Sequence, residues 1–184
     1  MFLGTAALAD AAVPLEHVPL VWKPTTATLQ SFTVDGFDAA VKIETFRDVR
    51  PDKAKIGENT EDLTPRLVTT SDDVGVFVSR HVRDLLVRAG VRNTEKDSAV
   101  IVRGEVRQFF VEETDHYNSA VILQLTVVDR KGTKLWSGLA TGEARHFGHS
   151  YKLENYYEGL SDAIVEVVNS MLHNPGLQRA LSTH

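Results

Sequence analysis

Three consecutive segments in which apolar and polar residues alternate constrain the fold of this chain more than any other feature. They cover residues 99–111, 117–129 and 133–146. A side-chain period of two residues is the pattern of a β-strand with one buried face. The last two segments are separated by Asp129-Arg-Lys-Gly132, a typical tight hairpin turn whose glycine tolerates a positive φ. We therefore expect three long neighbouring strands.

Two amphipathic helices complete the pattern. One begins near Ser71 and ends at Gly90, and the other covers residues 153–172, before Asn174-Pro-Gly176. A further alternating strand covers residues 41–46. The order β-α-β-β-β-α predicts an α+β fold. We expect a mixed, mostly antiparallel sheet of about four strands with two main helices on one face.

The chain is expected to hold one domain preceded by a leader, because two full domains in 184 residues would each have a thin core. We expect residues 1–37 to be a signal-like remnant and an extended, proline-containing leader, and residues 38–184 to be a single α+β domain. Residues 1–9 are apolar and end in the small-x-small form of a signal-peptidase site. Pro14, Pro19 and Pro24 disfavour a long helix, and residues 28–34 suit a short strand.

The net charge and the cysteine content exclude or disfavour several classes of function. A net charge of −5 disfavours non-specific binding to nucleic acid, which needs clustered lysine and arginine. The chain has no cysteine, which excludes disulfides, thiolate catalysis and iron–sulfur clusters. We expect no cofactor and no metal. No apolar run is long enough to span a membrane, so membrane attachment would need a lipid anchor that this chain does not carry.

The charged segment that follows the first strand is the candidate recognition site. Loops at strand ends often carry binding residues, because a rigid strand positions them. The candidate partner-binding residues are Asp48, Arg50, Pro51, Asp52, Ile56 and Gly57. The alternative is a structural clasp, in which short-range ion pairs and turn residues close the strand end. We expect Arg50→Ala to leave the fold intact and Ile56→Asp to damage it.

Other candidate groups have structural explanations. The spacing of His146 and His149 could chelate a metal on a helix, but a strand end and a missing carboxylate favour a surface pair. Helix capping explains the acidic residues at 72 and 73. The polar row of Arg103, Glu105 and Arg107 is a solvated strand face, which could accept a partner if the sheet face is open. The sequence therefore nominates no catalytic residue.

Several segments together resemble the YajG-like bacterial lipoproteins. These are Phe46-Arg-Asp-Val-Arg-Pro-Asp52 with Ile56-Gly57, Leu85-Leu-Val-Arg-Ala-Gly90, and Asn155 before Leu160-Ser-Asp-Ala163. The resemblance covers about residues 39 to 182. It implies an envelope lipoprotein on the periplasmic side, associated with the outer membrane, with no established enzymatic activity and no agreed ligand. The lipidated cysteine of such proteins is absent from this chain.

The sequence thus predicts a non-catalytic cell-envelope module that acts by protein–protein interaction or assembly. The expected partner is an envelope protein or a second copy, bound through a sheet edge or face. An alternative is a periplasmic carrier of a lipid or glycan fragment, which requires a sizeable apolar cavity. A hydrolase would need a nucleophile and a base within hydrogen-bond reach.

Overall fold

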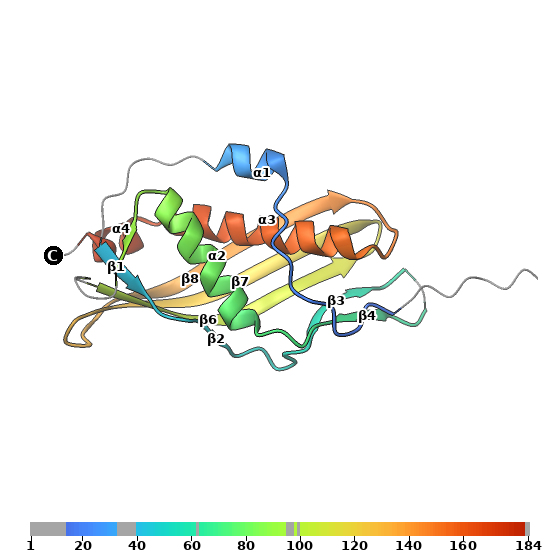
Figure 1. Ribbon diagram of the computed structural model, residues 1–184, viewed down its shortest axis with the longest axis horizontal. Coiled ribbons are helices and arrows are strands. Elements are labelled where there is room, and N and C mark those ends of the chain that lie inside the picture. Colours follow the sequence, from blue (N-terminus) through green and yellow to red (C-terminus); the bar gives the residue numbers. More distant parts are fainter. Residues whose placement is uncertain (1–13, 33–39, 62, 95–97, 99, 183–184) are drawn as a thin grey trace, which may run out of the picture.

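A computed structural model describes residues 14–32, 40–61, 63–94, 98 and 100–182, which form an eight-stranded mixed sheet with its helices on one face (Figure 1). The helices are α1 (Thr26–Ser31), α2 (Val74–Arg88), α3 (Leu153–Leu172) and α4 (Pro175–Leu181). The strands are β1 (Ala40–Ile43), β2 (Arg47–Asp48), β3 (Lys55–Asn59), β4 (Arg66–Thr69), β5 (Arg92–Asn93), β6 (Val100–Glu113), β7 (His116–Asp129) and β8 (Lys134–Phe147). The α+β fold class is confirmed. The expected number of about four strands is wrong.

The three long strands are the three alternating segments of the sequence. β6 pairs antiparallel with β7, and β7 pairs antiparallel with β8. At the predicted hairpin, Asp129 Oδ1 accepts hydrogen bonds from the backbone N–H groups of Lys131 and Thr133, both at 2.8 Å. Gly132 has φ 86°, the left-handed conformation for which glycine was expected. The long hairpins therefore follow from local sequence.

Short strands supply the additional width of the sheet. β1, β2 and β3 lie one after another along β6, each parallel to it, on the side opposite β7. β5 pairs parallel with β1, and β4 pairs antiparallel with β3. β2 and β5 contain two residues each, too few for an alternation to be recognised. β2 forms because β6 lies beside it and β5 because β1 lies beside it, so the sequence predicts fewer strands.

Helices α2 and α3 pack on the same face of the sheet, as expected. Helix α2 begins at Val74 rather than at Ser71, because Asp73 is its N-cap and accepts from the Val76 N–H at 3.0 Å. Gly90, with φ 91°, follows its C-terminus as predicted. The bounds of α3 match the expected 153–172, and Asn174 caps α4 through the N–H groups of residues 176 and 177.

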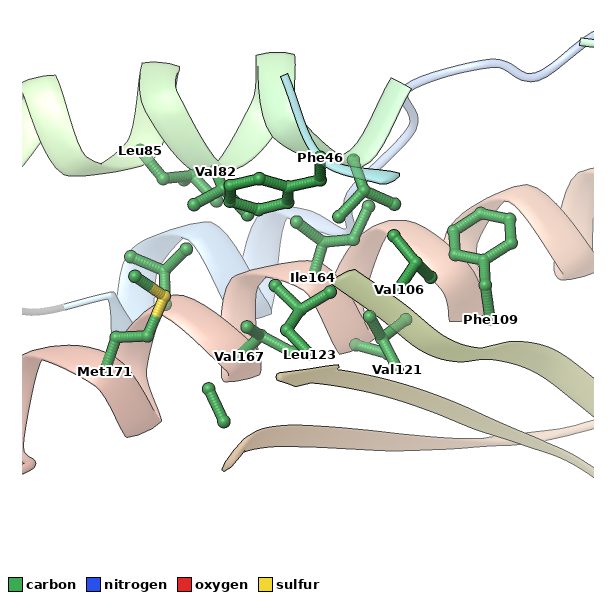
Figure 2. Packing of buried hydrophobic residues seen from close by; sticks show 14 of the residues in the cluster. Phe46, Val82, Leu85, Val106, Phe109, Val121, Leu123, Ile164, Val167 and Met171 are labelled. Atoms are coloured by element: carbon green, nitrogen blue, oxygen red, sulfur yellow. The ribbon is translucent and has the colours of Figure 1, made fainter. Parts of the chain in front are cut away.

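The core lies between the sheet and the two long helices (Figure 2). Phe109 on β6 and Leu123 on β7 are fully buried, and Ile164 on α3 packs against the same layer. Val82 and Leu85 on α2 belong to the same buried cluster. The space between sheet and helices is therefore filled by side chains.

The described part of the leader crosses the outside of the helices (Figure 1). Val18 N–H donates to the Thr69 carbonyl, and Trp22 stacks on His81 of α2 with ring centroids 4.1 Å apart. The expected strand at 28–34 is wrong where it is described. Residues Thr26–Ser31 form α1, because Thr25 caps the Thr28 N–H and satisfies the first turn. The signal-like residues 1–9 and the expected domain start at residue 38 lie outside the described residues. None of the described helices has the length and apolar character needed to cross a membrane.

Candidate functional site

The candidate loop is organised around a buried arginine. Arg50 is 6% exposed, and its guanidinium forms a two-point ion pair with Asp48, with Nε 3.0 Å from Oδ1 and Nη2 2.8 Å from Oδ2. The remaining donors reach backbone carbonyl oxygens: those of Lys53 at 2.6 Å, Lys55 at 2.8 Å and Phe109 at 3.2 Å. Arg50 thus joins the loop to the start of β3 and to β6.

The pKa of Asp48 also indicates that the Asp48–Arg50 ion pair is part of the interior. Burial on its own would raise the pKa of Asp48, but the hydrogen bonds and charge of Arg50 outweigh burial and lower that pKa. The carboxylate is therefore charged, and its charge is neutralised inside the fold. This differs from the exposed ion pairs expected from the sequence, because Arg50 is buried and its guanidinium contacts the Phe109 carbonyl oxygen of β6.

The other candidate residues divide into buried and exposed groups. Ile56 is fully buried, and a side chain at Gly57 would lie 2.6 Å from the Tyr156 ring and 2.9 Å from the Val111 carbonyl oxygen. Pro51 and Asp52 are exposed. Asp52 Oδ1 accepts from the N–H groups of Ala54 and Lys55, an interaction that shapes the turn. The structure brings the six residues together: Pro51 and Asp52 are exposed, Asp48 and Arg50 border an open groove, and a binding role for the loop stays a prediction.

A second candidate surface is the free edge of β8, by which we mean the backbone side of Lys134–Phe147 that faces away from β7. Among the described residues, β8 pairs only with β7. A strand edge of this length presents unpaired N–H and C=O groups, which can hydrogen-bond a further strand. Sequence reasoning expected a sheet edge without saying which one. The free edge could have been assigned to β8 from the sequence, because β8 is the last of three consecutive antiparallel strands.

An open groove runs beside the free edge. It has a volume of about 530 Å³ and is bordered by Thr141, Gly142 and Glu143 of β8, by Glu166 and Asn169 of α3, and by Ser31, Ser170 and His173. Helix α3 approaches β8 closely here: a side-chain carbon added at Gly142 would lie only 2.0 Å from the Ala163 carbonyl oxygen. The middle of the free edge thus faces an open space.

No described element covers the sheet face opposite the helices. The predicted polar row lies on this face and forms ion pairs: Arg103 Nε is 3.0 Å from Glu44 Oε2, and Glu105 contacts both Arg47 and Arg107. Charges that are already paired offer little to a partner. By contrast, Leu139 and Phe147 on β8 are 58% and 82% exposed. Two large exposed apolar side chains of this face therefore lie along β8.

The two histidines of the predicted pair do not converge. His146 Nε2 lies 3.2 Å from Asp162 Oδ2 of α3, whereas His149 lies 3.6 Å from Glu61. The nearby Asp162 carboxylate raises the pKa of His146 against the opposing effect of burial. Asp162 also accepts from the N–H and hydroxyl of Thr25, both at 2.8 Å, so this cluster fastens the leader to α3. In the described part of the chain, no group of three or more His, Asp or Glu residues could hold a metal ion.

No protein-family model matches the sequence, and no curated protein matches it. The fold resembles that of a Xanthomonas campestris protein of the DUF330 family, at 10% identity and a TM-score of 0.59 over 87% of this chain and 90% of that one. A PelC protein from Paraburkholderia phytofirmans, described as a dodecamer, has 13% identity and a TM-score of 0.43 over 75% and 92% of the two chains. A lipoprotein from Neisseria meningitidis has 14% identity and a TM-score of 0.41 over 74% and 99%. Only the first likeness establishes a shared fold, and the YajG-like relationship stays a prediction.

Proposed function

We propose that this protein is a non-catalytic binding module of the bacterial cell envelope, which takes an extended segment of a protein partner along the free edge of β8. The observation that carries the proposal is the edge itself: a long strand paired on one side, with an open groove beside its centre. Backbone hydrogen bonds to an edge strand provide affinity, and alternate side chains provide specificity.

The chemistry of β8 supports this assignment. Exposed apolar side chains at positions 139 and 147 flank the charged residues Glu143 and Arg145 on the same face of the strand. A partner strand would cover the apolar pair while its own charges met Glu143 and Arg145. The envelope location rests on the sequence resemblance to YajG-like lipoproteins and on the signal-like residues 1–9.

The packing favours a binding module over a ligand carrier. A lipid or glycan fragment would need an apolar cavity, and the layer between sheet and helices is occupied by Phe109, Leu123, Ile164 and their neighbours (Figure 2). The groove beside β8 is lined mainly by polar residues. These features suit a peptide backbone better than an acyl chain.

Site-specific photocrosslinking tests the proposal. A photoreactive residue is placed at Thr141 on β8, at Arg107 on the open face of β6, or at Val87 on the exposed side of α2, and the full chain is expressed in bacterial cells. We expect a discrete protein adduct from position 141 and none from the other two. Adducts of similar yield from all three positions, or none from position 141, would contradict the proposal.

A further inference from the structure

The free edge of β8 has a charge pattern that is complementary to itself. Glu143 and Arg145 lie two residues apart on one strand, so their side chains point to the same face. Both residues are exposed, and Glu143 has no ion-pair partner among the described residues. Arg145 Nη2 is hydrogen-bonded to the ring of His116, 3.1 Å from Nδ1. If a second copy of this strand runs antiparallel beside the first, the glutamate of each strand can face the arginine of the other.

We propose that the partner of β8 is a second copy of this chain, paired antiparallel through β8 about a two-fold axis at Ala144. This inference rests on the proposed function of the edge and names its occupant. A two-fold interface is isologous, so each contact occurs twice. With the axis at Ala144, Glu143 of each copy lies directly opposite Arg145 of the other.

Neighbouring registers are disfavoured by the same residues. Moving the axis to Glu143 places the two Glu143 carboxylates opposite each other, and moving it to Arg145 does the same to the two guanidinium groups. Like charges directly opposite on paired strands are destabilising, whereas opposite charges are stabilising. Charged residues on an edge strand often prevent pairing altogether. Here their order favours pairing about Ala144 and opposes the registers with the axis one residue to either side.

The apolar residues of β8 fit the same register. Phe147 lies opposite Thr141 of the second copy and diagonal to Leu139, within the reach that an aromatic side chain has across a strand pair. Leu139 and Phe147 are both largely exposed in the single chain. Pairing about Ala144 therefore covers the two exposed apolar residues of β8 with each other.

The geometry around the edge leaves space for the second strand. The groove beside Thr141, Gly142 and Glu143 lies at the part of the edge that would pair. Its remaining border, from α1, α3 and His173, is polar. The second copy's backbone can hydrogen-bond to β8 at this point without displacing a described strand.

Charge-reversal variants mixed in pairs test the proposal. Glu143→Arg alone creates two arginine–arginine contacts across the axis, and Arg145→Glu alone creates two glutamate–glutamate contacts. In a mixture of the two variants, every contact again joins opposite charges. The guanidinium introduced at position 143 of one variant meets the carboxylate introduced at position 145 of the other, and the native Glu143 meets the native Arg145. Molar mass is measured by analytical ultracentrifugation at low salt, where exposed ion pairs are strongest.

We expect the wild-type chain to dimerise, each variant alone to dimerise at least tenfold more weakly, and the equimolar mixture to recover the wild-type affinity as a heterodimer. Circular dichroism and melting temperature check that both variants fold, which we expect because positions 143 and 145 are exposed. Dimers that are insensitive to either reversal, or a mixture no stronger than the single variants, would overturn the register. A wild-type chain that stays monomeric at all concentrations would overturn self-pairing. In that case, a Thr141 photocrosslink to a different protein would still support the proposed function, and the absence of any crosslink would remove both.

Discussion

The guanidinium of Arg50 and the carboxylate of Asp48 form a buried two-point ion pair, with Nη2 and Oδ2 2.8 Å apart and each side chain less than a tenth exposed. Two residues of a highly charged loop thus belong to the interior of the protein. The pair also explains the shape of the loop, because the same guanidinium holds the carbonyl oxygens of Lys53 and Lys55.

Replacing Arg50 with alanine is therefore expected to destabilise the fold, contrary to the expectation from the sequence. The change leaves the Asp48 carboxylate buried without a counter-charge, and breaking a buried pair in this way costs about 3–5 kcal/mol. Urea unfolding followed by circular dichroism measures the loss. Asp52→Ala, which removes only an exposed turn-forming carboxylate, is the control and should cost about 1 kcal/mol or less. A loss for Arg50→Ala no larger than that of the control would show that the pair contributes little.

Ile56→Asp is expected to destabilise the domain strongly. Ile56 is fully buried on β3, and an aspartate there would be an unpaired charge in the core. We expect a loss of about 4 kcal/mol or more, since both packing and solvation are lost. Ile56→Val is the matched control and should cost about 1 kcal/mol. Near-equal melting temperatures for the aspartate and valine variants would contradict the burial of this position.

Gly142→Ala is expected to disturb the packing of α3 on β8. The added methyl group would lie 2.0 Å from the Ala163 carbonyl oxygen and 2.4 Å from the Val167 nitrogen, which are backbone atoms that cannot rotate away. Overpacking of this kind costs about 1–3 kcal/mol. Thermal unfolding of Gly142→Ala beside Thr141→Ala, whose side chain is exposed, measures the effect. The prediction fails if the glycine variant is as stable as the threonine variant.

His81 is expected to make stability depend on pH. Burial lowers its pKa to about 4, an effect that Asp84 opposes and Arg80 reinforces. Between about pH 6.5 and pH 4 the unfolded chain binds a proton at this histidine and the folded chain does not, so stability falls as pH falls through that range. The loss is on the order of 2 kcal/mol after allowance for partial solvent access.

The pH dependence of stability that His146 contributes has the opposite sign, so the effect of His81 has to be separated from it. Comparing wild type with His81→Gln does this, because His146 is present in both proteins. The raised pKa of His146 gives stability that is present below pH 6.5 and is lost as pH rises through the folded-state value. We expect the difference in unfolding free energy between wild type and His81→Gln to vary between pH 4 and pH 6.5 and to be constant above it. A difference that is constant over the whole range would argue against a neutral His81 in the folded protein.

Long periodic segments explain what could be predicted from the sequence. The strands β6, β7 and β8 and the helices α2 and α3 each repeat their pattern over several turns or pleats, so local residues determine them. The capping residue Thr25 was a usable signal for α1, but the segment has no apolar stripe and its anchor is Asp162, far along the chain.

The parts that could not be predicted depend on distant partners. The acceptors of Arg50 include the Phe109 carbonyl, 59 residues away, and nothing in the local sequence indicates that an arginine among charged residues is buried. The two-residue strands β2 and β5 likewise exist because β6 and β1 lie beside them. For the candidate site, the sequence located a loop but did not indicate that its Asp48–Arg50 ion pair is buried. The free edge of β8 becomes visible only when the strand order is known.

Cysteine crosslinking at the proposed two-fold axis tests the pairing of β8 most directly. The chain has no native cysteine, so Ala144→Cys and Thr141→Cys each introduce a single thiol. In the proposed register the two residues at position 144 face each other, whereas the two at position 141 are about 20 Å apart. We expect mild oxidation to give a disulfide-linked dimer of Ala144→Cys and no such dimer of Thr141→Cys. Equal crosslinking of the two variants, or crosslinking of Thr141→Cys alone, would contradict the pairing of two copies through β8.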